Sequence, residues 1–63
     1  MKKIVQLKEN QSVSIQQLET LLANVRGDII IRPQENIIIV QNGSVDSIRQ
    51  IITLLNQQGI EVL

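Results

Sequence analysis

The residue types that most often carry out catalysis are scarce in this chain of 63 residues, which contains no histidine and no cysteine. The usual general base, thiol nucleophile and soft metal ligands are therefore missing. The acidic residues are scattered singly: Glu9, Glu19, Asp28, Glu35, Asp46 and Glu61. No two of them are spaced to hold one ion. We predict no enzymatic activity, no metal site and no cofactor, and leave open only a Ser–Lys pair brought together by folding.

Asn42, Gly43 and Ser44 form the short motif with the clearest alternative chemistry. They connect a predicted strand to a predicted helix, where free backbone amides can bind a phosphate or a carboxylate. Walker and dinucleotide loops carry several glycines, whereas this loop has one. A tight turn followed by a helix cap also explains each residue. A small regulatory domain that binds a ligand or anion at residues 42–44 is therefore the alternative function.

Two amphipathic helices are predicted from a pattern that repeats at an offset of thirty residues, with Ser14 aligned to Ser44. In each copy, apolar residues recur at i, i+3, i+6, i+7 and i+10, which places them on one face of a helix. Both serines are suited to be helix N-caps, and Gly27 and Gly59 follow the two stripes as predicted C-terminal residues. The stripes consist of Ile15, Leu18, Leu21, Leu22 and Val25, and of Val45, Ile48, Ile51, Ile52 and Leu55.

Four segments rich in β-branched residues are predicted as strands, and they span residues 4–8, 28–32, 36–41 and 60–63. Pro33 and Asn36 favour a tight turn, which makes the middle two strands a hairpin. The element order is then βαββαβ. Right-handed crossovers fold this order into a ferredoxin-like α+β domain, a four-stranded antiparallel sheet with two helices on one face. We predict one such domain over residues 1–63.

This order of elements resembles the small heavy-metal-associated domains, whose ligand cysteines lie in the loop after the first strand. That loop, residues 9–13, has no thiol here, so the resemblance implies the topology and not a copper-carrier function. Residues 36–57, a strand followed by a serine-capped helix, resemble the strand–helix unit of ring-forming secretion-system domains, which favours assembly. Neither resemblance includes a functional residue, and we assign the sequence to no family.

The predicted hairpin contains consecutive isoleucines, and successive side chains of a strand point to opposite faces, so both of its faces are apolar. Two helices cover only one face of such a sheet, and each buried isoleucine is worth roughly 1.5 to 3 kcal/mol. We therefore expect self-association through the hairpin and the sheet surface or an edge strand. The alternative is that singly exposed apolar residues are common. The predicted interface residues are Ile29, Ile30, Ile31, Ile38 and Val40.

Charge and composition indicate which classes of partner, and which cellular compartment, to expect. Six basic and six acidic residues cancel, and Phe, Tyr and Trp are absent, so neither a nucleic acid nor an anionic membrane is an expected partner. No apolar run approaches the roughly 18 residues of a membrane span, and the first residues are too polar for a signal sequence, so we expect a cytoplasmic protein. The sequence predicts a small non-enzymatic assembly module that forms a homo-oligomer, with a larger protein as a further possible partner.

Overall fold

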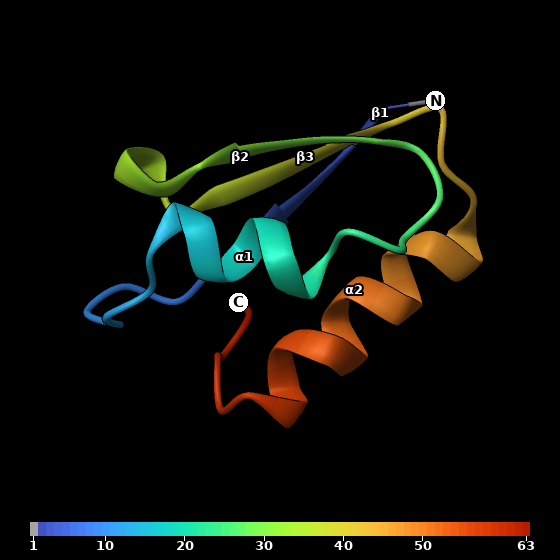
Figure 1. Cartoon of the computed structure of the whole chain (residues 1–63). Helices are drawn as coiled ribbons and strands as arrows, with labels where there is room; N and C mark the ends of the chain where they lie inside the picture. The colour runs from blue at the N-terminus through green and yellow to red at the C-terminus, as the bar shows by residue number, and fades with distance from the viewer. Residues whose placement is uncertain (1) are drawn as a thin grey trace.

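The computed structural model describes residues 2–63 and contains a three-stranded antiparallel sheet and two α-helices (Figure 1). The elements are β1 (Lys2–Gln6), α1 (Ile15–Leu21), β2 (Asp28–Arg32), the 3₁₀ helix η1 (Pro33–Glu35), β3 (Ile37–Gln41) and α2 (Val45–Gln57). The strand order is β1-β3-β2, so β3 is the central strand. Both α-helices lie on one side of the sheet, below it in Figure 1. The other side of the sheet is covered by neither helix.

The predicted four-stranded ferredoxin-like sheet is wrong, because residues 60–63 do not form a strand. They make one isolated antiparallel bridge, between Leu7 and Val62, with one backbone hydrogen bond on each side of it (3.0 and 2.9 Å). The segment meets the chain at Leu7, where β1 has already ended, and Ile60 is buried in the core directly before it. Too few positions face each other for a ladder, so the domain is an α+β fold with three strands.

The predicted N-cap and C-terminal residue of α2 are confirmed. The Ser44 hydroxyl accepts a hydrogen bond from the Ser47 amide (3.2 Å), and the Ser47 hydroxyl accepts one from the Ser44 amide (3.3 Å), which is a reciprocal capping box. At the other end Gly59 adopts φ +75°, and the Ile60 amide donates to the Leu55 carbonyl (2.9 Å). Local signals in the sequence therefore fix both ends of the longer helix.

α1 is shorter than its apolar stripe predicts. Ser14 caps it by accepting a hydrogen bond from the Gln17 amide (3.1 Å), but the helix ends at Leu21. Val25 lies beyond the helix and is still buried in the core. The prediction that Gly27 follows the end of this helix is wrong. Gly27 lies directly before β2 and adopts φ +116°. A helix continued to Val25 would leave only two residues to reach the first position of β2.

The core is aliphatic and lies between the two helices and the side of the sheet that faces them. It consists of Val5, Leu7, Leu18, Leu22, Val25, Ile38, Val40, Ile51, Leu55 and Ile60. Later residues of both stripes are buried in this core, whereas the first residues of the two stripes, Ile15 and Val45, are 46% and 58% exposed. Within residues 2–63, neither helix combines the length and the hydrophobicity that crossing a lipid bilayer requires.

Candidate interaction surface: the open face of the sheet

The strand register determines which side chains face away from the helices. Residues paired across strands point to the same side, and successive residues alternate. Val5 pairs with Ile38, which also pairs with Ile31, and all three pack in or against the core. Residues one position away therefore lie on the opposite side, which we call the open face. Across β1, β3 and β2 they form three rows: Lys2, Gln41 and Asp28; Ile4, Ile39 and Ile30; and Gln6, Ile37 and Arg32.

The middle row of the open face is entirely apolar, and we call Ile4, Ile39 and Ile30 the isoleucine row. Ile39 is only 7% exposed although neither helix covers it, because it is flanked by Ile4 on one neighbouring strand and by Ile30 on the other. The two flanking side chains remain 57% and 37% exposed. The row therefore presents apolar surface to the solvent at the centre of the open face.

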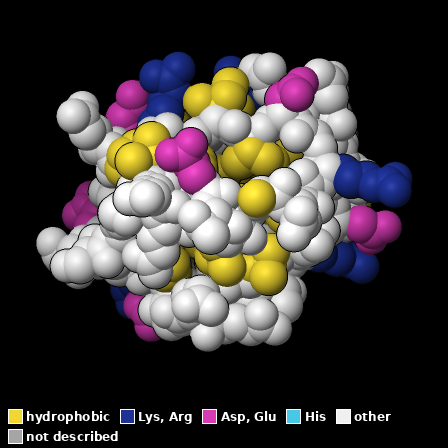
Figure 2. Space-filling view, viewed as in Figure 1, with side chains coloured by type: hydrophobic (Ala, Val, Ile, Leu, Met, Phe, Trp, Pro, Cys, Tyr) yellow, Lys and Arg dark blue, Asp and Glu magenta, His cyan; other side chains and the backbone are white. Residues whose placement is uncertain are grey.

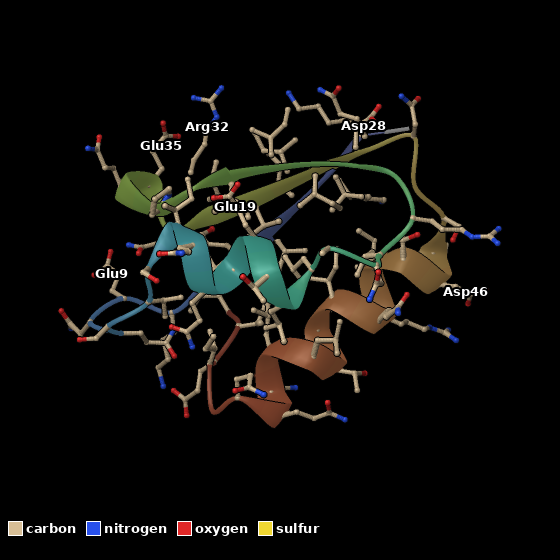
Figure 3. The ribbon with its side chains drawn as sticks, in the orientation of Figure 1. Glu9, Glu19, Asp28, Arg32, Glu35 and Asp46 are labelled. Atoms are coloured by element: carbon tan, nitrogen blue, oxygen red, sulfur yellow. The ribbon has the colours of Figure 1, made fainter. Side chains whose placement is uncertain are left out.

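Charged side chains border the isoleucine row at both ends of the strands. Lys2 and Asp28 lie in one outer row and Arg32 in the other, and Figure 3 shows Asp28 and Arg32 at opposite ends of β2. The Asp28 carboxylate accepts a hydrogen bond from the Asn42 side-chain amide (2.8 Å). The Arg32 guanidinium lies 3.8 Å from the Glu35 carboxylate, and both side chains are more than half exposed, so this pair contributes little. An apolar centre with a polar rim is the usual arrangement of a protein interface.

Of the five predicted interface residues, only Ile30 lies on the open face. Ile38 and Val40 are buried in the core, with exposures of 0% and 1%, and Ile29 and Ile31 are half-buried against it. Consecutive isoleucines predict apolar side chains on both faces of the strands, as the structure has them, but the sequence does not show which of them face the helices. Ile4 and Ile39 are not among the predicted residues, because only the pairing of β1 with β3 places them beside Ile30.

Asn42, Gly43 and Ser44 lie together in the loop between β3 and α2, and each has a structural role there. Asn42 adopts φ +57° and its side-chain amide donates to a β2 carboxylate. A Cβ on Gly43 would lie 2.8 Å from Val40 Cγ1, so only glycine fits without a shift. Ser44 caps α2, and the carboxylate of Asp46 in the first turn already brings negative charge to the positive end of the helix dipole. Packing and capping account for this loop without a bound anion.

A shallow hollow of about 560 Å³ opens between α1 and the end of α2. It is lined by Ser14, Gln16, Gln17, Thr20, Leu21 and Gln58. Side-chain amides and hydroxyls dominate this lining, and none of the lining residues is charged. The Ser14 hydroxyl already accepts a hydrogen bond from the Gln17 amide as the N-cap of α1. In the part of the chain that the structure describes, no three His, Cys, Asp or Glu residues lie close enough together to hold a metal ion. The open face is therefore the best-defined candidate site.

No protein-family model matches this chain, and neither a curated protein nor a solved structure matches it significantly. The function is therefore argued from the geometry of the open face and from the composition of the chain.

Proposed function

We propose that the protein is a small non-enzymatic interaction module that associates with further copies of itself through the open face of its sheet. The isoleucine row is the observation that carries the proposal. If full burial of an isoleucine is worth roughly 1.5 to 3 kcal/mol, covering the 57% of Ile4 that is exposed contributes about 1 kcal/mol or more. That is a substantial gain for a domain of this size, whose core alone gives marginal stability. The lack of His and Cys supports the non-enzymatic part of the proposal.

The charges on the open face favour a second copy as the occupant. We consider two open faces that pack against each other about a two-fold axis parallel to β3. Each copy then places Lys2 opposite Asp28 of the other copy, because these two residues lie in the same row on opposite sides of β3. Ile4 meets Ile30 in the same way, and Ile39 meets its own counterpart. Opposite charges and apolar groups thus match without a second type of partner.

The experiment is to measure mass against concentration by size exclusion with light scattering, from about 10 μM to 1 mM. We expect the wild-type chain to exceed its monomer mass of 7.1 kDa as the concentration rises. Ile4→Lys should weaken association at least tenfold, because it places a charge in the centre of the apolar contact. Val45→Lys is a matched control, because Val45 is also apolar and 58% exposed but lies on α2 and not in the sheet.

Two results would overturn the proposal. One is a wild-type chain that stays at monomer mass up to 1 mM. The other is an equal effect of Ile4→Lys and Val45→Lys, since only Ile4 lies on the open face. Far-ultraviolet circular dichroism of both variants checks that each remains folded, so that a loss of association is not mistaken for a loss of structure.

A further inference from the structure

The two edges of the sheet differ in how they are protected. β1 carries Lys2 and Lys3, and lysine on an edge strand opposes pairing with another strand. The chain after β1 is in addition bridged by Val62. β2 forms the other edge and has three consecutive isoleucines, with charges only at its two ends. β2 thus offers an edge strand with three apolar residues between its charged ends and no lysine, which is the kind of edge that accepts a further strand.

The sequence of β2 is complementary to itself when it is read in opposite directions. It runs Asp28, Ile29, Ile30, Ile31, Arg32. Two such strands paired antiparallel about a two-fold axis at Ile30 place Ile30 opposite Ile30 of the second copy. Asp28 then lies opposite Arg32 of the second copy at both ends of the pairing, and Ile29 lies opposite Ile31. Opposite charges and apolar pairs directly across an antiparallel pair are the favourable cross-strand contacts.

We propose that β2 joins β2 of a second copy in this register, so that two three-stranded sheets become one continuous six-stranded sheet. This inference rests on the proposed self-association and specifies the contact by which two copies first join. An open groove of about 240 Å³ beside β2 supports the pairing. It lies between α1 and β2, and most of its lining is apolar: Leu22, Val25, Ile29 and Ile31, with Glu19 among them. Figure 2 shows hydrophobic side chains at the surface in this region, around an acidic one, and Figure 3 labels Glu19 between α1 and β2.

The proposed pairing would bring further apolar side chains next to this groove, because residues opposite each other in a strand pair point to the same side of the sheet. Ile29 and Ile31 of the second copy would therefore lie on the helix side of the sheet, next to the groove and to the same two residues of the first copy. Four half-buried isoleucines would come together there. The strand pairing thus covers apolar surface on the side of the sheet that the open face does not use.

The area of the open face supplies a second argument for the edge contact. Three strands of five residues span roughly 14 by 17 Å at the usual spacing and rise, so two such faces bury only about 500 Å² in total. Specific interfaces bury at least about 1,000 Å². Pairing at β2 doubles the face of each unit. Two six-stranded faces that overlap completely bury about that value, and in this arrangement the isoleucine row, and not the contact of Lys2 with Asp28, is matched across the two faces. The isoleucine row then continues across all six strands.

The test uses disulfide cross-linking, and the absence of native cysteine makes a single introduced cysteine unambiguous. Ile30→Cys should form a covalent dimer under mild oxidation, because residues directly opposite in an antiparallel pair have Cα atoms about 4.5 to 5.5 Å apart, within the range of a disulfide. Asp28→Cys is the control on the same strand and face. Two such residues would be about 14 Å apart in the proposed register, at 3.4 Å per residue, and should not cross-link.

Charge reversal tests the register in a second way. In the Ile30→Cys background, Asp28→Arg places like charges opposite each other at both ends of the pairing and should slow cross-linking about fivefold or more. Arg32→Asp should have the same effect. The chain that carries both reversals restores opposite charges and should cross-link nearly as fast as the parent, which neither a folding defect nor a change in net charge would produce.

The outcomes separate this inference from the proposed function. Equal cross-linking of Ile30→Cys and Asp28→Cys would overturn the pairing of β2, even if Ile4→Lys still weakened association. Open faces packed without edge pairing place Ile30 opposite Ile4 of the other copy, so the two Ile30 residues would be about 14 Å apart, too far for a disulfide. Conversely, efficient cross-linking at Ile30 together with no effect of Ile4→Lys would support the edge contact and remove the open face from the proposed function.

Discussion

Replacing Gly43 with alanine tests whether the loop between β3 and α2 is shaped by packing. Gly43 does not adopt a positive φ, so an added Cβ meets only a steric obstacle, which is Val40 Cγ1 at 2.8 Å. Two carbon atoms are best placed about 3.5 to 4.0 Å apart, and Val40 is 1% exposed and cannot move into the solvent. We expect Gly43→Ala to lower the free energy of unfolding by about 1 to 3 kcal/mol, the usual cost of overpacking a core. In a domain of this length the midpoint temperature falls by roughly 5 to 20 °C.

The assay is urea denaturation followed by circular dichroism, at one fixed protein concentration because the proposed association would also raise the apparent stability. A double-mutant cycle with Val40→Ala isolates the steric contact. Val40→Ala alone removes two buried methyl groups and should cost about 2 kcal/mol. In the double variant the new methyl group at position 43 occupies part of the vacated space, so its cost should be at least about 0.5 kcal/mol smaller than the two single effects together.

Either of two results would refute the packing argument. The first is a loss below about 0.5 kcal/mol for Gly43→Ala, the size of an ordinary surface change. The second is strict additivity of the two substitutions. A loss of stability that appeared only in the presence of inorganic phosphate would instead point to the anion site that the sequence allowed.

Four further substitutions follow from the caps and from the two faces of the sheet. Gly59→Ala places a Cβ in open space but forces alanine to φ +75°, so it should cost about 1 to 2 kcal/mol in urea denaturation, and a neutral result would contradict the left-handed helix end. Ser44→Ala should cost about 1 kcal/mol, and adding phosphate should raise the melting temperature of neither this variant nor the parent beyond a matched chloride control. Ile38→Ala should cost about 2 to 5 kcal/mol, whereas Ile30→Ala, at a side chain that is 37% exposed, should cost only about 1 to 2 kcal/mol in the monomer, and a larger loss at Ile30 than at Ile38 would contradict the assignment of the two faces.

The features that the sequence predicted correctly are those that depend on a few neighbouring residues. Ser44 marks the start of α2 because its hydroxyl accepts from an amide three residues later, and Gly59 marks its end because glycine tolerates a positive φ. The turn between β2 and β3 follows in the same way from Pro33 and from Asn36, which adopts φ +57°. The bounds of β2 agree with the prediction for residues 28–32.

The features that the sequence did not predict depend on pairing between distant segments. Residues 60–63 have the composition of a strand, but whether they form one depends on where they meet β1, and they meet the chain at Leu7, beyond its end. The orientation of the isoleucines is the second example. Within a run of consecutive isoleucines, the face that each one occupies is set by the helices that pack against the sheet and by the register with β1. The candidate surface therefore depends on the strand register that places Ile4, Ile39 and Ile30 in one row, and a single sequence does not show that register.

The unequal edges of the sheet limit how far an assembly of this protein can grow. A sheet with two equally receptive edges can add strands at both and extend into a fibre. In the proposed pairing, one symmetric contact would use the isoleucines of β2, and the outermost strands of the unit would be two copies of β1 with Lys2 and Lys3 on each. Those lysines repel a further strand of the same kind. If β2 pairs as proposed, growth at the sheet edges would stop at two copies, because the remaining edges carry these lysines, and the apolar hairpin would not lead to an extended fibre.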